Sequence, residues 1–442
     1  MGEELCSVGV DVGTTTTQLI VSKLRVQNTA SAFAVPELEI RERQVVYRSP
    51  VYFTPLIRDQ RVDGEKIREI IHGEYAKAGI SRKTVDTGAV IITGETSRKE
   101  NAAAVLENLS DLAGNFVVAT AGPHLESVLA AKGAGAVTWS EETGKRVLHF
   151  DIGGGTSNWA MIEAGKILRT GCLNVGGRLV KLDQTGCVTY LSPVIERLCK
   201  LSVGDRVTEQ RVREVAEMLV HGLEMAAGLR KQTELLQQLR TLEAGDSPMT
   251  PPGDCVISFS GGVADCILQK RDWLAFGDMG PLLGQAIRES KLCAGQYRLG
   301  TETIRATVIG AGCHSAQLSG STVFCRNVAL PVKNLPVVTA VEELDGLDGP
   351  GILAISGEIG RSYGELCALA DRLASAIPGQ ILLALEADAA KALGHALALR
   401  LPADRPILCL DRVRLRQGDY LDVGQPVGPA FPVVVKTLIL ER

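Results

Sequence analysis

One pattern occurs twice in this chain and constrains its fold more than any other feature. Residues 7–10 predict an apolar strand, an Asp-x-Gly turn begins at Asp11, and a β-branched return strand follows over residues 14–21. The segment around Asp151 repeats the same order of apolar strand, Asp-x-Gly, small or hydroxyl-bearing residues and second strand. An internal repeat of this kind predicts two similar lobes that face one another.

Two further glycine-rich turns follow strands later in the chain. Residues 256–259 predict a strand and residues 263–268 the start of a helix, with a tight turn between them. Residues 308–314 are interpreted in the same way, as strand, turn and helix. The turn residues are Ser260, Gly261 and Gly262 in the first case and Gly310 and Gly312 in the second. A single turn of this type is typical of a structural hairpin or bulge, whereas four in order, each after a strand, favour a functional role.

Length and composition limit the class of protein. The 442 residues are enough for roughly two to three domains of about 100 to 200 residues each. Apolar residues make up 45% of the chain and aromatic residues 4%, and glycine occurs 47 times, which is typical of a soluble α/β protein. The net charge of -4 comes from interspersed charges of both signs. The sequence therefore predicts no basic surface for nucleic acid or for an anionic membrane.

Cysteine and histidine are both scattered. The 11 cysteines show no Cys-x-x-Cys spacing, so neither a disulfide framework nor a zinc site is predicted. The 6 histidines support no metal cage built by the protein alone. The chain starts without a charged leader and apolar core, and no stretch approaches the ~18 apolar residues of a membrane span. We therefore expect a cytoplasmic protein with reduced thiols.

The chain is predicted to contain two lobes and a smaller third domain. A helix is expected over residues 65–77, and a long helical stretch runs from Thr208 to about Leu242. Pro331 and Pro336 mark a boundary near residue 328. The expected units are a first lobe over residues 1–145 with a subdomain inserted near residues 25–85, a second lobe over residues 146–327 with a helical insertion, and a C-terminal α/β domain over residues 328–442.

Shorter elements are expected within these units. In the first lobe, residues 89–93 predict a buried strand, residues 97–113 an amphipathic helix and residues 116–119 another strand, an order that implies a parallel crossover. In the C-terminal domain, strands are expected near residues 351–355, 381–385, 407–410 and 433–439.

The paired turns suit a polyphosphate that carries a magnesium ion. Backbone N–H groups in Gly-Thr turns supply donors for phosphate oxygens, and Mg²⁺ keeps several waters while taking only one or two carboxylates. Asp11 and Asp151 are therefore the candidate metal-binding residues, one from each lobe. The Walker P-loop and G-x-G-x-x-G patterns do not occur in these turns, which disfavours both of those nucleotide-binding folds.

As a set, the four turns resemble the two phosphate-binding segments, the adenosine segment and the hinge segment of the actin-like ATPase superfamily, which includes actin, heat-shock chaperone ATPases and sugar kinases. The fold this implies is α/β, with two ribonuclease H-like lobes and here an additional small C-terminal α/β domain. More narrowly, Thr-Gly-Glu-Thr-Ser-Arg-Lys-Glu-Asn at residues 93–101, Tyr-Leu-Asp-Val-Gly-Gln-Pro-Val at 420–427 and Val-Val-Val-Lys-Thr-Leu at 433–438 resemble the ethanolamine ammonia-lyase reactivating factors. That similarity runs along the whole chain.

The resemblance implies an ATP-dependent chaperone for the adenosylcobalamin-dependent ethanolamine ammonia-lyase, with ATP and Mg²⁺ as cofactors. Such a factor exchanges damaged cobalamin for intact adenosylcobalamin, hydrolyses ATP slowly, and is associated with a bacterial microcompartment. Asp11 and Asp151 would hold Mg²⁺ through water. The residues implied to contact phosphate are Gly13, Thr14, Thr15, Gly153, Gly154, Gly155 and Thr156. Those implied to lie against the purine and ribose are Ser260, Gly261 and Gly262. Gly310 and Gly312 are implied to allow close packing at the hinge between the lobes.

Several roles stay open at the level of sequence. Glu95 is the candidate for orienting the attacking water, and it fits equally well as a carboxylate at the N-terminus of the helix expected from Ser97. Asp265 fits an acidic residue in the first turn of a helix. The phosphate-contacting lysine that superfamily chaperones often use has no counterpart in these turns. A small-molecule kinase, which would share the four turns, is the main alternative function, and a nucleotide-binding scaffold or filament protein is the third.

Overall fold

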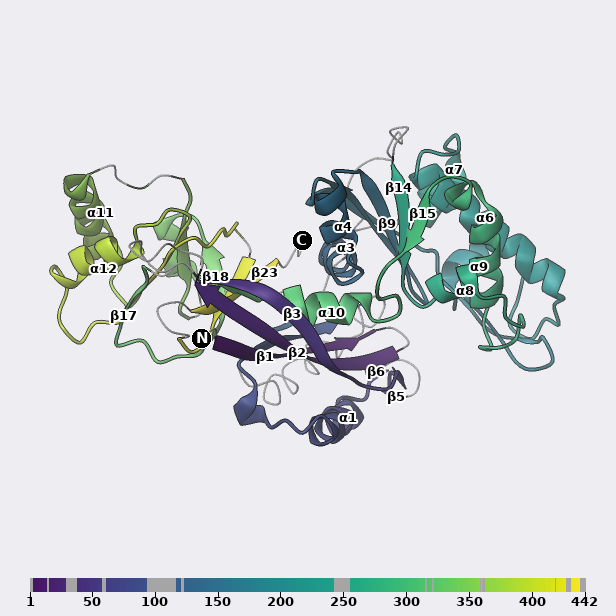
Figure 1. Cartoon of the computed structure of the whole chain (residues 1–442), viewed down its shortest axis with the longest axis horizontal. Coiled ribbons are helices and arrows are strands. Elements are labelled where there is room, and N and C mark those ends of the chain that lie inside the picture. Colours follow the sequence, from purple (N-terminus) through teal and green to yellow (C-terminus); the bar gives the residue numbers. More distant parts are fainter. Residues whose placement is uncertain are drawn as a thin grey trace.

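The computed structural model contains three α/β units that follow one another along the chain (Figure 1). The first unit lies between the other two. The structure describes residues 3–13, 16–28, 38–57, 61–93, 117–120, 123–241, 255–314, 316–319, 322–347, 349–357, 359, 362–417, 419–426 and 431–437. The expected architecture of two α/β lobes and an additional α/β unit is confirmed.

The first unit is built on a mixed sheet with the strand order β3-β2-β1-β7-β8. Its strands are β1 (Glu3–Val12), β2 (Thr16–Asn28), β3 (Leu38–Arg48), β7 (Thr87–Ile92) and β8 (Val117–Thr120), and the short β4 (Tyr52–Phe53) pairs with β2. β1 and β2 form the predicted hairpin, and β7 and β8 add in parallel. The helix expected over residues 97–113 lies outside the described residues.

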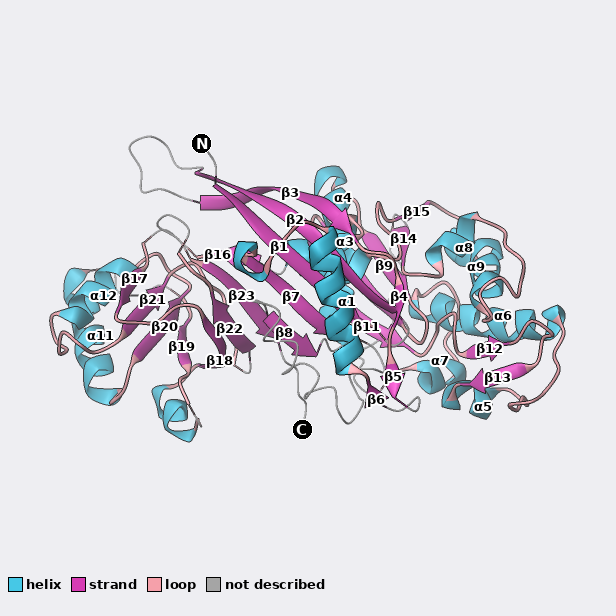
Figure 2. Cartoon of the chain, turned by 90° about the horizontal axis from the view of Figure 1, so that it is seen from below, coloured by secondary structure: helices cyan, strands magenta, loops and turns pink. Residues whose placement is uncertain are grey.

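The segment between β2 and β7 divides into two parts. β3 pairs with β2 and so extends the first sheet. The remainder holds the small hairpin of β5 (Leu56–Ile57) and β6 (Arg61–Val62) and the helix α1 (Gly64–Lys77), which confirms the predicted helix. Asp63 caps α1 by accepting a hydrogen bond from the backbone N–H of Lys66. Figure 2 shows α1 lying across one face of the first sheet.

The second unit repeats the hairpin of the first. Its sheet has the order β11-β10-β9-β14-β15, in which β9 and β10 are antiparallel and β14 runs parallel to β9. The strands are β9 (Val147–Ile152), β10 (Ser157–Glu163), β11 (Lys166–Leu173), β14 (Val256–Ser260) and β15 (Tyr297–Leu299), and a separate pair is formed by β12 (Val180–Leu182) and β13 (Val188–Leu191). The helices are α5 (Pro193–Leu198), α6 (Glu209–Ala226), α7 (Glu234–Leu239), α8 (Ala264–Leu268) and α9 (Gly280–Glu289).

The expectation of one helical stretch from Thr208 to about Leu242 is wrong, because the chain forms the two helices α6 and α7. α6 ends at a Schellman motif, in which Gly228 has a φ of 71° and its N–H donates to the carbonyl of Met225. The N–H of Leu229 closes the motif by donating to Glu224. A glycine in this left-handed conformation ends the helix.

The segment over residues 308–314 is also corrected. It is expected as strand, turn and helix, but it lies wholly within the helix α10 (Ala306–His314). α10 follows the second sheet in sequence yet packs against β1 and against α3 (Pro123–Gly133). α3 in turn packs against β10 and β11, and α4 (Ala136–Thr143) follows it. α3 and α10 therefore join the first unit to the second.

Glycines set the close approach of α3, α10 and β1. A Cβ atom added at Gly310 would lie 2.0 Å from the carbonyl oxygen of Leu129, and one at Gly133 would lie 1.9 Å from that of Ala306. A Cβ atom at Gly9 on β1 would lie 2.5 Å from the carbonyl oxygen of Val308. Main chain therefore contacts main chain at this junction, which only glycine permits.

The third unit is an eight-stranded sheet with the order β16-β23-β22-β18-β19-β20-β21-β17. β16 and β17 precede residue 328 but pair within this sheet. The expected strands near residues 351–355, 381–385, 407–410 and 433–439 are confirmed as β19, β20, β21 and β23. The elements are β16 (Ala316–Leu318), β17 (Phe324–Arg326), β18 (Val332–Val338), β19 (Ile352–Ile355), α11 (Tyr363–Ala376), β20 (Ile381–Leu385), α12 (Ala390–Ala398), β21 (Ile407–Leu410), β22 (Asp419–Val423) and β23 (Pro432–Thr437).

None of the helices within the described ranges combines the length and the apolar character needed to cross a membrane.

Candidate functional site

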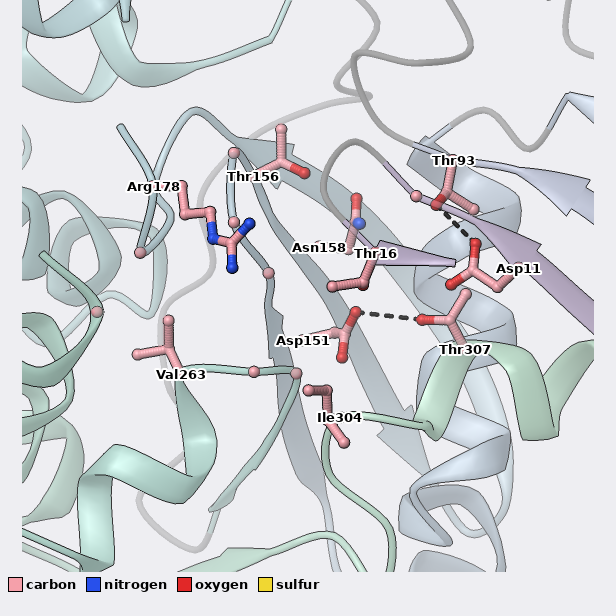
Figure 3. A pocket seen from close by; sticks show the side chains of 18 of the residues that line it. Asp11, Thr16, Thr93, Asp151, Thr156, Asn158, Arg178, Val263, Ile304 and Thr307 are labelled. Carbon is pink, nitrogen blue, oxygen red and sulfur yellow. Dashed lines mark hydrogen bonds between the residues drawn. The ribbon is translucent and has the colours of Figure 1, made fainter. Parts of the chain in front are cut away.

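A pocket of about 250 Å³ opens between the first two units, and both repeated turns contribute to it. The first unit supplies Asp11, Gly13 and Thr16, and the second supplies Asp151 and the turn that follows it. Figure 3 shows the side chains of Asp11 and Asp151 converging on the same space from opposite sides. The predicted residues that line the pocket are Asp11, Gly13, Asp151, Gly153, Gly154, Gly155, Thr156, Gly261 and Gly262.

The same hydrogen bond occurs at both turns. In the first, the N–H of Gly13 donates to the carbonyl of Thr16 at 2.9 Å, and in the second the N–H of Gly153 donates to that of Thr156 at 3.0 Å. Each turn joins antiparallel strands, so each aspartate has a fixed partner across the hairpin. The repeat thus places one carboxylate and one glycine turn on either side of the pocket.

An amide side chain lies directly across the hairpin from each aspartate. Gln18 pairs with Asp11, and Asn158 pairs with Asp151. Residues that face each other in an antiparallel pair project from the same side of the sheet. Gln18 and Asn158 accordingly line the pocket as well. The internal repeat therefore covers an acid and an amide in each unit, and only the acids were predicted from the sequence.

The amide oxygens of these two side chains have no hydrogen-bond partner among the residues that the structure describes. The amide nitrogen of Gln18 donates to the carbonyl of Ile304 at 3.1 Å, and that of Asn158 donates to Glu126 at 2.5 Å. Gln18 is 3% exposed and Asn158 is 4% exposed. A buried oxygen without a partner costs free energy, so both oxygens are suited to a donor that enters the pocket.

Burial controls the ionisation of the two aspartates. It raises the pKa of Asp11 to about 7, with the hydrogen bond from Thr93 (2.8 Å) opposing this rise and the charge of Asp151 adding to it. Burial also raises the pKa of Asp151 to about 6, against the hydrogen bonds from Ser260 (2.5 Å) and Thr307 (3.3 Å). Two partly protonated acids that face one cavity are suited to a cation, whose charge stabilises both carboxylates.

A buried chain of hydrogen bonds orients Asp151. The hydroxyl of Ser260 donates its single hydrogen to Asp151, so Nε2 of His149, 2.9 Å from that hydroxyl, must carry a hydrogen and donate to it. Nδ1 of His149 then accepts from Ser258 at 3.1 Å. Burial, aided by the charge of Arg298, lowers the pKa of His149 to about 3, so the ring is neutral. Ser260, which the sequence predicts beside a purine, contacts Asp151 through its hydroxyl.

The remaining candidate residues lie in different places. Gly310 and Gly312 belong to the α3, α10 and β1 junction and are not among the residues that line this pocket. Asp265 accepts a hydrogen bond from Thr303 at 2.7 Å. Thr14, Thr15 and Glu95 lie outside the described residues.

Arg178 lines the pocket although no sequence signal pointed to it. It follows Gly176 and Gly177, where the chain folds back so that the backbone N–H of Arg178 donates to the carbonyl of Gly154 at 2.7 Å. Its Nε donates to Asp278 at 3.0 Å. The long-range fold, rather than any local spacing, brings this cation to the second turn.

The residues present fit a hydrated magnesium ion. No group of three or more histidine, cysteine, aspartate or glutamate side chains in the described ranges could hold a metal ion by itself. Mg²⁺ does not need such a group, since it retains waters and binds through one or two carboxylates together with phosphate oxygens. Asp11 and Asp151 supply the carboxylates, and the free amide oxygens can accept hydrogen bonds from metal-bound water.

Comparison with known proteins decides the family. The family model for ethanolamine utilisation protein EutA matches residues 3–352 and 350–441. The chain belongs to the EutA family. The proteins named ethanolamine ammonia-lyase reactivase EutA from Salmonella typhimurium and from Escherichia coli are each 38% identical to it over 468 aligned residues, which cover 98% of this chain and 98% of each relative. The resemblance to ethanolamine ammonia-lyase reactivating factors is therefore confirmed.

Solved structures show more distant similarity to this EutA family member. An exopolyphosphatase from Cytophaga hutchinsonii aligns with a TM-score of 0.40 and 13% identity over 70% of this chain and 96% of its own. The ethanolamine utilization protein EutJ from Carboxydothermus hydrogenoformans aligns with a TM-score of 0.35 and 19% identity over 69% of this chain and 88% of its own.

The raised pKa of Asp151 makes a testable prediction for the stability of the ligand-free EutA family protein. A folded-state pKa of about 6, above the ordinary aspartate value of 3.8, means that the folded state binds the proton more tightly than the unfolded state. The contribution of Asp151 to stability is therefore greatest at low pH and is lost as the pH rises through 6. We expect Asp151→Asn to raise the free energy of unfolding at pH 8 and to have little effect at pH 4.

Urea unfolding of both proteins at pH 4, 6 and 8 measures this difference. The substitution Asp404→Asn, at an exposed aspartate of the third unit, is the control and should show no such pH dependence. An Asp151→Asn protein that is less stable than the unaltered protein at pH 8 would contradict the assignment.

Proposed function

We propose that this protein binds ATP and Mg²⁺ between its first two units and uses them to reactivate ethanolamine ammonia-lyase, by promoting exchange of damaged cobalamin for intact adenosylcobalamin. The observation that carries the proposal is the convergence of Asp11 and Asp151 on one pocket. It occurs in a chain that is 38% identical to ethanolamine ammonia-lyase reactivases over 98% of its length.

The chain's own groups divide the work of holding the nucleotide. Gly154, Gly155 and Thr156 present backbone N–H groups to phosphate oxygens. At Gly13 and Gly153, whose N–H groups close their own turns, the absence of a side chain leaves room for those oxygens to approach. When bound, Mg²⁺ supplies the charge that offsets the phosphates. Thr14 and Thr15, in the first turn, are proposed to add hydroxyl donors.

Asp11 and Asp151 would hold the hydrated cation from the two units, and the amide oxygens of Gln18 and Asn158 would accept hydrogen bonds from its waters. Thr93 and Ser260 keep the carboxylates oriented by donating to them. Gly261 and Gly262 border the pocket on the second unit, where we place the purine and ribose. Glu95 keeps its proposed role of orienting the attacking water in slow ATP hydrolysis.

ATP can act on a partner only through its different affinity for different arrangements of the protein. The pocket has walls on both units, so bound nucleotide favours the arrangement in which both walls contact it. A lyase bound elsewhere on the chain would then be favoured in the conformation that releases damaged cobalamin. The cytoplasm, in association with a bacterial microcompartment, is the proposed location. The small-molecule kinase is not favoured, because the relatives are named reactivases.

Reactivation of a damaged lyase tests the proposal. Ethanolamine ammonia-lyase inactivated with its damaged cobalamin in place is incubated with this protein, ATP, Mg²⁺ and free adenosylcobalamin, and ammonia release is followed. We expect activity to return only when all four are present, and Asp404→Ala protein to act like the unaltered protein. If the lyase stays inactive while a small metabolite becomes phosphorylated, the kinase is the function and the proposal is wrong.

A further inference from the structure

The pocket is strongly acidic, and a single described residue that lines it carries a positive charge. Asp11, Glu126, Asp151 and Asp278 contribute carboxyl groups, and Arg178 contributes a guanidinium. A triphosphate bears several negative charges, so a wall of carboxyl groups opposes its entry unless cations intervene. A Mg²⁺ ion held by Asp11 and Asp151 would offset negative charge on their side of the pocket.

Arg178 is placed to act on the opposite side. Its Nε donates to Asp278, and the two side chains are 23% and 7% exposed, so this ion pair is shielded from water. The two terminal nitrogens make no hydrogen bond to a residue of the described ranges, and Figure 3 shows the guanidinium turned toward the middle of the pocket. A guanidinium with two such nitrogens is suited to bidentate contact with a phosphate.

Arg178 also contacts the first unit. Its guanidinium carbon lies 5.2 Å from the centre of the Phe53 ring, within the range of a cation–π contact. Phe53 belongs to β4 and pairs with Thr16, the residue that closes the first turn. It is 74% exposed, which is unusual for a phenylalanine. Arg178 thus touches the second turn through its backbone and the strand beside the first turn through its side chain.

We propose that Arg178 is the phosphate-recognising cation of this pocket and that Phe53 positions it. Arg178 would supply the positive charge that a phosphate-contacting lysine often provides in superfamily chaperones and that these turns lack. On binding, the terminal nitrogens take phosphate oxygens while Asp278, which also accepts from the N–H of Gly280 at 2.9 Å, competes for the guanidinium. This inference rests on the proposed function, since it requires a nucleotide in the pocket.

Calorimetric titration with ATP and Mg²⁺ tests the role of Arg178. Arg178→Met keeps the length of the side chain and removes the charge, and we expect affinity to fall roughly 10- to 100-fold, as for loss of a charged hydrogen-bond donor. Arg178→Lys should recover part of the loss. The control is Arg211→Met, which removes an arginine paired with Glu214 on the surface of α6 and should not change ATP affinity.

Asp278→Asn makes a prediction of opposite sign. Asparagine can still accept the hydrogen bond from Gly280, but its neutral side chain competes less well for Arg178. We expect ATP affinity to rise several-fold, which general damage to the fold would not produce. A lower affinity would contradict competition between Asp278 and phosphate and so overturn the proposed role of Arg178.

The positioning role of Phe53 is tested by a double-mutant cycle. Phe53→Ala alone should weaken ATP binding about two- to fivefold, the range expected of an exposed cation–π contact. It should have no effect when Arg178 is already methionine, because the ring acts through the guanidinium. Equal losses in both backgrounds would exclude that coupling. If the unaltered protein binds ATP and Arg178→Met binds it equally well, this inference alone fails, whereas absence of ATP binding to the unaltered protein overturns the proposed function too.

Discussion

Replacing Asp11 with alanine is expected to lower the affinity for ATP in the presence of Mg²⁺ by about 100-fold. This is the upper end of the range for residues that act on a metal ion through the ligands around it. Asp11 is the candidate metal-binding carboxylate of the first unit, and without it Asp151 would be the only one of the two left to hold the ion. Calorimetry with and without Mg²⁺ measures the effect. In excess chelator, the altered and unaltered proteins should bind ATP with similar, weak affinity.

Asp404→Ala is the matched control for this experiment, because it removes an exposed aspartate from the third unit. Circular dichroism should show that both variants are folded. Asp11→Ala is not expected to destabilise the ligand-free protein, since the pKa of Asp11 is raised by burial to about 7. A folded Asp11→Ala protein with unchanged affinity for Mg²⁺ and ATP would remove the metal role of this residue.

Replacing Gly310 with alanine is expected to destabilise the fold by about 3 kcal/mol, the upper range for an overpacked core. The added methyl group would lie 2.0 Å from the carbonyl oxygen of Leu129, which is main chain and cannot rotate away. α10 and α3 would have to separate along their contact. The apparent midpoint of urea unfolding should fall, and ATP affinity should fall with it because the junction joins both walls of the pocket.

Gly73→Ala is the matched control, since Gly73 is also a helical glycine but a Cβ atom there meets nothing within 4 Å. In α1 this change should stabilise the protein by up to about 1 kcal/mol, because alanine favours the helix more than glycine does. The two substitutions are chemically identical and are expected to act in opposite directions. A Gly310→Ala protein as stable as the unaltered one would show that the junction is looser than the structure indicates.

Much of the fold was predictable because local patterns agreed with long-range contacts. The hairpins around Asp11 and Asp151 each carry an Asp-x-Gly turn directly after an apolar strand, and this local pattern agrees with the antiparallel pairing in the structure. The segment over residues 308–314 was misassigned for a physical reason. Its small apolar residues fit a buried strand or a buried helix equally well, and packing against α3 decides between them. The break after α6 did have a local signal, Gly228, which marks a helix C-terminus.

The residues of the candidate site also include some that the sequence could predict and some that it could not. Asp11 and Asp151 were found because the repeat marks them, and the amides Gln18 and Asn158 could have been found by extending the comparison of the two hairpins by seven positions. Arg178 could not, because it reaches the pocket only through the fold of the chain after β11. An internal repeat can identify residues that occur in both units, such as the paired aspartates. It gives no information on a residue such as Arg178, which belongs to one unit alone.

The contact of α3, α10 and β1 determines how the two walls of the pocket can move. Side chains normally form a layer in which helices slide past one another, and such a layer is missing where Gly9, Gly133 and Gly310 bring backbones together. Such backbone contacts resist translation of one helix along the other, so we expect any movement of the second unit against the first to be a rotation about the junction. A rotation of this kind would displace α7, at the far end of the second unit, more than it would displace the walls of the pocket (Figure 1).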